Sequence, residues 1–347
     1  MKVLVTGASG FLGGHLVEGA LRAGHQVRVL VRPGQDHALP AALPEVERVH
    51  GDLGDAAALS RAAEGVDVVH HSAARVTLYG TRAQFWETNV AGTERLLTAA
   101  RSAGARRFVF ISSPSALMNP GEGDRLGIDE TTPYPDRFYN HYSETKAAAE
   151  RLVRAADGPE FTTVSLRPRG IWGPRDHSGF LPRLIARLVA GRLPDLSGGR
   201  RVMASLCHCD NAVSAALLAA EAPAERVGGK AYFIVDRDPV ELRELMVRVT
   251  ELFGGTPPTR AVPPPLRDAL VEAVELLWRV PALAARREPP LSRYSVALLT
   301  RSGTYDTSAA ERDFGYSPVI DGETGLRRLA RWVESAGGTE EFVRSVR

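Results

Sequence analysis

Short apolar runs alternate with amphipathic stretches through the first half of the chain. Runs rich in Val, Ile, Leu and Phe predict strands at residues 3–6, 27–31, 67–70, 107–111 and 162–166. Between them, apolar positions three or four apart predict helices at about residues 11–23, 85–101 and 142–155. Strands that alternate with helices indicate an α/β fold with a doubly wound parallel sheet covered on both faces.

The alternation loosens after about residue 170, where prolines become frequent. Residues 231–235 still have the apolar character of a strand that returns to the sheet. We therefore expect residues 1–170, with this strand, to form a sheet domain. Residues 171–347 should form mainly a smaller lobe over the carboxyl ends of the strands.

Within this lobe, residues 265–285 have the pattern of an amphipathic helix, with Leu266, Leu270, Val274 and Leu277 on one face. The simplest interpretation is a helix packed on its own domain. A lid over an apolar substrate and a helix lying on a membrane surface are the two alternatives.

A glycine pattern joins the first strand to the first helix. Its glycines permit a tight turn and a close approach of the backbone to a pyrophosphate, and the helix N-terminus adds free N–H groups. The position between a strand and a helix makes this a Rossmann-type dinucleotide site. The residues expected there are Gly7, Ser9, Gly10, Phe11, Leu12 and Gly13.

The end of the second strand bears on the choice between NAD and NADP. An acidic residue there would bind the ribose 2′-hydroxyl and repel a 2′-phosphate, but the sequence has Val31 and Arg32. Because a guanidinium suits a phosphate, we expect NADP(H) to be preferred; NAD(H) remains open if Arg32 is only a solvated loop residue. Asp52 and Leu53 lie where adenine is expected, although a short acidic turn is an equal alternative for Asp52.

Tyr142 and Lys146 are four residues apart and share one face of a predicted helix. A nearby ammonium favours a phenolate, so Lys146 is expected to lower the pKa of Tyr142. The preceding strand ends in Ser112 and Ser113, and the carboxyl end of a strand is the ligand side of an open α/β sheet. The three side chains together indicate acid–base chemistry on a carbonyl or alcohol.

The composition narrows the choice of partner and compartment. Lys and Arg number 43 against 41 Asp and Glu, so a net charge of +2 gives no reason to expect nucleic acid. Cys207 and Cys209 have no second pair at zinc spacing, so we expect no metal. We expect no transmembrane segment and no signal peptide, and hence a cytoplasmic protein, because no apolar run approaches the ~20 residues that span a bilayer.

These motifs resemble the extended short-chain dehydrogenases/reductases, and among them the 3β-hydroxysteroid dehydrogenase branch, over nearly the whole chain. The segments that carry the resemblance, besides the glycine loop and residues 142–146, are residues 71–74, 89–93, 166–174, 229–234, 289–294 and 312–318. The resemblance implies that Tyr142 donates or accepts the proton, that Lys146 tunes it and also binds the cofactor, and that Ser113 anchors the carbonyl oxygen. It also implies cofactor contacts from Ser72, Ala73, Ala74, Asn89, Tyr142, Lys146 and Pro168.

The function expected from the resemblance is reduction of a ketone, or oxidation of a secondary alcohol, on a small apolar substrate of the β-oxoacyl, polyketide or sterol-like kind. Arg169, Trp172 and Phe180, with Ser113, are expected to contact that substrate. A nucleotide-sugar epimerase or dehydratase is one alternative, although Pro114 and Ser115 replace the acid pair of the dehydratases. A non-catalytic nucleotide-binding regulator is another, and a homodimer is left open.

Overall fold

The computed structural model describes residues 1–35, 46–77, 79–278, 280 and 289–346. Its largest element is a seven-stranded sheet in which every pair of neighbours is parallel. The strands are, in spatial order, β11 (Lys230–Ile234), β7 (Thr162–Pro168), β5 (Arg107–Ile111), β4 (Val68–His71), β1 (Lys2–Thr6), β2 (Gln26–Val31) and β3 (Glu47–His50). The order reverses between β1 and β4, which is the Rossmann-type arrangement that the sequence predicts.

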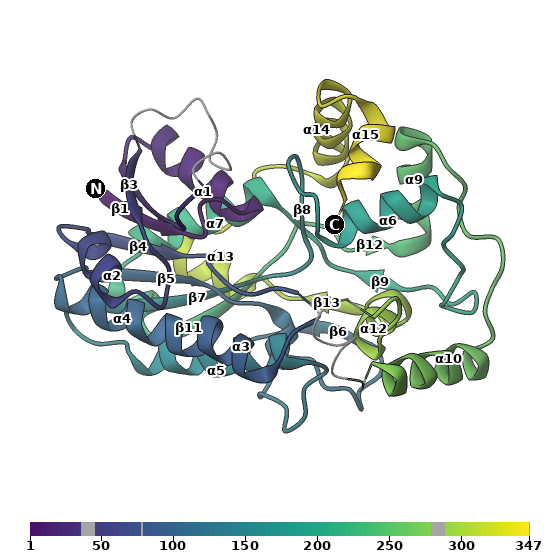
Figure 1. Ribbon diagram of the computed structural model, residues 1–347, viewed down its shortest axis with the longest axis horizontal. Helices are drawn as coiled ribbons and strands as arrows, with labels where there is room; N and C mark the ends of the chain where they lie inside the picture. The colour runs from purple at the N-terminus through teal and green to yellow at the C-terminus, as the bar shows by residue number, and fades with distance from the viewer. Residues whose placement is uncertain (36–45, 78, 279, 281–288, 347) are drawn as a thin grey trace.

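Helices cover both faces of this sheet because successive residues of a strand point to opposite sides. Val3 and Val5 belong to one apolar core and Leu4 to the other. The first core is closed by α1 (Phe11–Arg22), α7 (Cys209–Glu221), α8 (Ala224–Val227) and α13 (Ser308–Phe314). The second is closed by α2 (Ala56–Ala63), α4 (Gly92–Ser102) and α5 (His141–Ala155), on the other side of the sheet (Figure 1).

A second, smaller part lies beyond the carboxyl ends of the strands (Figure 1). Its four-stranded mixed sheet has the order β12 (Val240–Glu241), β9 (Met203–Ala204), β13 (Gly303–Tyr305) and β6 (Arg125–Ile128), and a two-stranded sheet pairs β8 (Ile171–Trp172) with β10 (Cys207–His208). Its helices are α6 (Phe180–Val189), α9 (Leu242–Phe253), α10 (Pro264–Leu277), α12 (Arg293–Thr300), α14 (Gly322–Ser335) and α15 (Gly338–Ser345). The chain crosses between the two parts repeatedly, since β6 joins the small sheet and β11 the large one.

The helix expected at residues 265–285 corresponds to α10, while residues 279 and 281–285 lie outside the described part of the chain. A proline at its start suits the first helical turn, where no N–H is needed. Only Val271 is buried on it, against Val296 of α12, whereas Leu266 and Leu270 expose 54% and 48% of their surface. Among the described helices, none has both the length and the apolar character needed to cross a membrane.

A buried ion pair fastens α5 to β7. The Arg167 guanidinium donates to the Glu150 carboxylate at 2.6 and 3.0 Å, and Tyr134 donates to the same carboxylate at 2.5 Å. The side chains of Glu150 and Arg167 are 0% and 2% exposed. These bonds hold the pKa of Glu150 below its ordinary value although burial alone would raise it.

We expect Glu150→Gln to destabilise the protein by about 3–5 kcal/mol, because it leaves the Arg167 charge buried without its partner. Urea unfolding followed by circular dichroism measures this loss. Glu144→Gln is the matched control, since Glu144 lies on the same helix but pairs with the exposed Arg82, where water replaces the lost contact. An equal loss of unfolding free energy in the two variants would show that burial does not make the Glu150–Arg167 pair more costly to break.

Candidate active site

The glycine loop between β1 and α1 has the close contacts that a dinucleotide cradle requires. Gly7 has φ +73°, and a Cβ built on it would lie 2.7 Å from the Ala73 backbone nitrogen. A Cβ on Gly13 would lie 2.0 Å from the Gly7 carbonyl oxygen, so no larger residue fits either position. Gly10 is the N-cap of α1 and supplies no side-chain cap, which leaves the first N–H groups of the helix available to an anion.

The structure places the other loop residues in different surroundings. Leu12 is buried in the core, and the Phe11 ring packs edge-on against His15 at 5.3 Å between centroids. Ser9 and Arg32 both donate to the Gln35 side-chain oxygen, at 3.5 and 3.0 Å. Arg32 is exposed, and it shares the Gln35 oxygen with Ser9 of the glycine loop.

The remaining residues expected at the cofactor follow the ends of β3, β4 and β7. Asp52 is exposed and accepts from the Gly54 backbone at 2.8 Å, which is the short acidic turn, while Leu53 is buried in the core. Ser72, Ala73 and Ala74 directly follow β4, and the backbone of the first two closes over Gly7. Pro168 is the last residue of β7.

Asn89 lies in a π-helical turn and connects the loop after β4 with α5. The helix expected at residues 85–101 consists of α3 (Arg82–Trp86), a π-helical turn at Glu87–Ala91 and α4, and π-turns are frequent at functional sites. The Asn89 side chain accepts from the Arg75 N–H at 2.7 Å and donates to the Thr145 hydroxyl at 3.0 Å. It therefore ties the loop after β4 to α5, and its described partners are protein groups.

Tyr142 and Lys146 lie on the first two turns of α5. Asn140 starts the helix by accepting from the Ser143 N–H at 2.8 Å. One turn beyond Tyr142, the Lys146 ammonium donates to the Ile111 carbonyl at 2.5 Å and lies 4.5 Å from the centroid of the Phe110 ring. Lys146 is therefore fixed against the end of β5, the strand that leads to Ser113.

Ser113 and Ser115 form a pair of hydroxyls at the end of β5. Ser115 donates to the Ser113 oxygen at 2.9 Å, and the Ser113 side chain caps the short 3₁₀-helix at Pro114–Leu117. Ser113 also interacts with the Tyr142 hydroxyl, which lowers the pKa of that phenol, but burial is the larger effect and raises it. In the chain by itself burial thus raises the pKa of Tyr142, against the lowering expected from Lys146, whose ammonium donates to a backbone carbonyl.

A cleft of about 490 Å³ includes Pro114, the residue after Ser113, in its wall. Its lining is mainly apolar, with arginines and tyrosines between the apolar side chains. The lining residues are Pro114, Leu117, Met118, Asn119, Glu122, Gly123, Arg125, Ile128, Tyr139, Arg169, Ala297, Arg301, Ser302, Gly303 and Tyr305. Of the residues expected at the substrate, Arg169 lines this cleft and Ser113 directly precedes Pro114 at its wall.

Trp172 and Phe180 are not among the residues that line the cleft. The Trp172 indole donates to Asp236 at 3.0 Å and packs edge-on against His208, so it is only 3% exposed. Phe180 begins α6 and packs against the apolar core of the lobe. The Trp172 ring is thus taken up by the interior, whereas Phe180 is only partly buried against the core.

Two residues of the site were not expected from the sequence. Ser115 is the partner of Ser113 in the hydroxyl pair. Tyr294 of α12 interacts with Ser115 and with the charge of Tyr142. Burial raises the pKa of Tyr294, and its ring lies edge-on to Tyr139 at 5.7 Å between centroids. The signal in the sequence was the segment 289–294, which carries the family resemblance, but nothing in its spacing places Tyr294 beside Tyr142.

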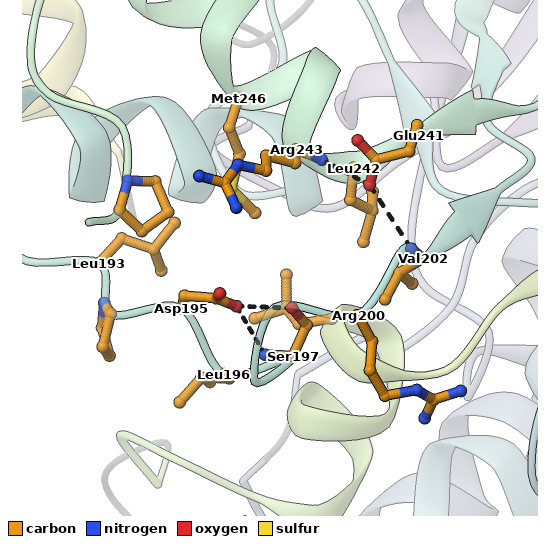
Figure 2. A pocket seen from close by; sticks show the side chains of 13 residues that line it. Leu193, Asp195, Leu196, Ser197, Arg200, Val202, Glu241, Leu242, Arg243 and Met246 are labelled. Atoms are coloured by element: carbon orange, nitrogen blue, oxygen red, sulfur yellow. Dashed lines mark hydrogen bonds between the residues drawn. The ribbon is translucent and has the colours of Figure 1, made fainter. Parts of the chain in front are cut away.

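A second hollow of about 480 Å³ lies within the small lobe (Figure 2). Asp195 organises one side of it by accepting from the backbone and the hydroxyl of Ser197, at 2.8 and 2.6 Å. On the other side Glu241 caps the start of α9. None of the residues lining this hollow is Ser113, Tyr142 or Lys146 or a neighbour of one of them in the sequence, whereas the first cleft includes Pro114, the residue after Ser113.

His15, Cys209 and Asp210 bring metal-ligand atoms within 4.8 Å of one another in the described part of the chain. Both ring nitrogens of His15 already have partners, the Pro174 carbonyl at 2.9 Å and the Arg175 guanidinium at 3.1 Å. Burial raises the pKa of Cys209, which disfavours the thiolate that a metal needs. The group therefore fits a hydrogen-bonded imidazole better than a cation site.

A tyrosine and a lysine one helical turn apart, facing a serine at the edge of a parallel sheet, characterise the extended short-chain dehydrogenases/reductases, and this chain is one of them. More closely, it belongs to the 3-beta hydroxysteroid dehydrogenase/isomerase family, whose match covers residues 4–264. This confirms the branch that the sequence motifs indicate.

Two similar proteins of known name are reductases. The chain is 39% identical to a 2-alkyl-3-oxoalkanoate reductase of Stenotrophomonas maltophilia, with 95% of this chain and 98% of that protein covered. It is 37% identical to a 4-hydroxy-2-methyl-3-oxo-4-farnesyl-3,4-dihydroquinoline-1-oxide ketoreductase of Stigmatella aurantiaca, over 95% and 96% of the two chains. Both alignments span the small lobe as well as the nucleotide-binding sheet.

Solved structures show the same architecture. The crystal structure of a protein called gox2253 superposes with a TM-score of 0.78 at 25% identity, covering 97% of this chain and 98% of its own. A dTDP-glucose 4,6-dehydratase of Streptomyces venezuelae gives 0.72 at 26% identity, over 96% and 97% of the two chains, and its structure holds NAD. The shared fold therefore serves ketone chemistry and sugar chemistry alike.

The burial of Lys146 predicts a pH-dependent contribution to stability. Burial lowers its pKa from 10.5 to about 7. Between these values the unfolded chain binds the proton and the folded chain does not, so the free energy of unfolding should rise with pH by up to about 1.4 kcal/mol per pH unit. Below pH 7 both the folded and the unfolded chain carry the charge, so Lys146 no longer makes the free energy of unfolding depend on pH.

Lys146→Met removes the titrating group and isolates its effect. The difference in unfolding free energy between the wild type and this variant should move in favour of the wild type as the pH is raised from 7 to 9. Urea unfolding at a series of pH values measures it, and other titrating groups cancel in the difference. A difference that does not change with pH would show that Lys146 keeps an ordinary pKa.

Proposed function

We propose that the protein is a nicotinamide-dependent ketoreductase, or secondary-alcohol dehydrogenase, that acts on an apolar β-oxoacyl, polyketide or sterol-like substrate. The observation that carries this proposal is the interaction of the Ser113 and Tyr142 side chains after β5, where the next residue, Pro114, belongs to the wall of a mainly apolar cleft. The two reductases at 37–39% identity act, by their names, on ketones attached to large apolar groups.

The residues present fit a dinucleotide cofactor. The glycine loop is closed so tightly that a Cβ would fill it, and the uncapped N-terminus of α1 offers N–H groups to a pyrophosphate. In this proposal Lys146 would bind the nicotinamide ribose and Arg32 a 2′-phosphate. We infer that NADP(H) is preferred and that NAD(H) is possible.

The side chains of this site supply the proton chemistry of a ketone reduction. When bound, the nicotinamide supplies the hydride, and negative charge then develops on the substrate oxygen. Ser113 holds that oxygen by a hydrogen bond while Tyr142 donates its proton to it. The raised pKa of Tyr142 keeps the phenol protonated at neutral pH, so the proton is available. Lys146, with its positive charge, then stabilises the phenolate.

The sugar-modifying alternative has less support from the residues of the cleft. In this chain Pro114 and Ser115 follow the catalytic serine, without the acid pair expected of a dehydratase. The cleft wall beside Ser113 is formed by Pro114, Leu117 and Met118, which suits an acyl chain better than a sugar. The retained Tyr142 and Lys146 argue against a regulator without catalysis.

Tyr142→Phe keeps the ring and removes the transferable proton. Turnover should fall by about 10²–10⁴-fold, the usual size of a general-acid contribution, while cofactor affinity changes little. The rate is measured by nicotinamide absorbance with a panel of ketones, and affinity by fluorescence titration. Near-normal turnover in this variant would show that the acid lies elsewhere.

Ser113→Ala should cost less than Tyr142→Phe but more than Ser112→Ala, its matched control. Successive residues at the end of a strand point to opposite sides, and Ser112 lies toward Glu150 on the buried side. If Ser112→Ala lowered turnover more than Ser113→Ala, the role of holding the substrate oxygen would belong to Ser112 instead.

Arg32→Ala tests the cofactor preference. The variant should bind NADPH about 10- to 100-fold more weakly, because a charge-assisted contact to the 2′-phosphate is lost. NADH is the internal control, since it lacks that phosphate and its affinity should stay the same. Dissociation constants from fluorescence titration decide the matter: equal weakening of both cofactors, or a wild-type preference for NADH, would refute the assignment.

A further inference from the structure

Ser115 is a buried hydroxyl that the proton chemistry above does not use. It is only 2% exposed, and its hydroxyl donates to the Ser113 oxygen at 2.9 Å. Serine hydroxyls in helical turns often donate to a nearby backbone carbonyl instead. Tyr294 also interacts with Ser115, but burial raises the pKa of Tyr294, so this phenol keeps a proton of its own for that contact. The Ser115 proton is therefore left to Ser113.

The run Ser113-Pro114-Ser115 explains why Ser115 meets the Ser113 oxygen twice. Ser113 has an extended backbone (φ −160°, ψ 143°) and is the N-cap of the 3₁₀-helix at Pro114–Leu117. Pro114 has no N–H, so the first N–H of this turn belongs to Ser115. That N–H donates to the Ser113 side-chain oxygen at 3.2 Å. One residue thus supplies both a backbone donor and a side-chain donor to the same oxygen.

These two donors fill the acceptor capacity of the Ser113 hydroxyl. A serine hydroxyl has two lone pairs and one proton. Because Ser115 occupies both lone pairs, Ser113 can form a further hydrogen bond only as the donor. Its contact with Tyr142 agrees with this direction, since it lowers the pKa of that phenol, as a donor to the phenolate oxygen does.

We propose that Ser115 is a positioning residue that fixes Ser113 as a hydrogen-bond donor toward the oxygen of the substrate. The proposal rests on the proposed ketoreductase function and assigns a role to the Ser113-Pro114-Ser115 run. A ketone oxygen accepts hydrogen bonds and becomes a stronger acceptor as negative charge develops on it. Donors to the Ser113 oxygen also polarise its O–H bond, so the bond to the substrate oxygen strengthens with them. Ser115 acts in this way through Ser113.

Ser115→Ala removes the hydroxyl and keeps the backbone N–H. The kcat for ketone reduction, followed by nicotinamide absorbance, should fall about 3- to 10-fold, which is the size of one lost hydrogen bond. Cofactor affinity, measured by fluorescence titration, should stay the same. Ser115→Thr restores the hydroxyl and should recover most of the lost kcat.

Ser143→Ala is the matched control for the loss of a buried hydroxyl. Ser143 is 0% exposed and directly follows Tyr142, but its hydroxyl has no hydrogen-bond partner in the described part of the chain. Its kcat should equal that of the wild type. A loss in Ser143→Ala as large as in Ser115→Ala would show that any buried truncation near the site lowers turnover, and it would overturn the positioning role.

The double variant Ser113→Ala/Ser115→Ala distinguishes positioning from a direct or purely structural role. If Ser115 acts only through Ser113, its removal costs nothing more once the Ser113 hydroxyl is gone. The double variant should then have the kcat of Ser113→Ala. Losses that multiply in the double variant, or an unchanged kcat in Ser115→Ala, would overturn the positioning role alone. A wild type that turns over no ketone or secondary alcohol with either nicotinamide cofactor would instead overturn the proposed function, and this role with it.

Discussion

The parallel pairing of β5 with β7 is the constraint on which the rest of the site depends. Its register, Ile111 opposite Leu166, brings the serine after one strand beside the arginine after the other. The same two strands carry the contacts that orient α5, since Lys146 donates to the Ile111 carbonyl and Glu150 pairs with Arg167. A helix held at two points one turn apart cannot rotate without breaking a buried contact, so Tyr142 is fixed toward Ser113.

The parts of the site that could be predicted from the sequence are those whose chemistry is local. A glycine that must accommodate a positive φ, or a Tyr and a Lys one helical turn apart, is defined by a few neighbouring residues. The strand order also follows from alternation, because right-handed crossovers leave few ways to arrange such strands. The π-helical turn that carries Asn89 has no local signal, since the extra residue is accommodated by packing against Leu53 and the loop after β4.

The cleft could not be predicted because its walls come from distant segments. Met118, Tyr139, Arg169 and Ala297 meet only when β6 and β13 pair across the small sheet. Apolar character alone also does not distinguish pocket residues from interior ones. Trp172 is a residue type common in apolar pockets, yet its indole N–H donates to Asp236 inside the lobe. In α10 the amphipathic pattern does not mark a buried face. Among its described residues only Val271 is buried, and its leucines are exposed.

Two buried cations of different character lie near the carboxyl ends of β5 and β7, Lys146 at the Ile111 carbonyl and Arg169 directly after Pro168. Lys146 is held against an aromatic ring and a carbonyl, and burial lowers its pKa to about 7, so its charge responds to what is bound nearby. Arg169 cannot give up its proton in the same way, because a guanidinium stays charged at any pH a protein tolerates. The lysine is therefore suited to a charge that appears and disappears on Tyr142 during turnover. The Arg169 guanidinium keeps a permanent charge, which the Ser205 and Gly303 carbonyls and the Tyr305 ring hold in place.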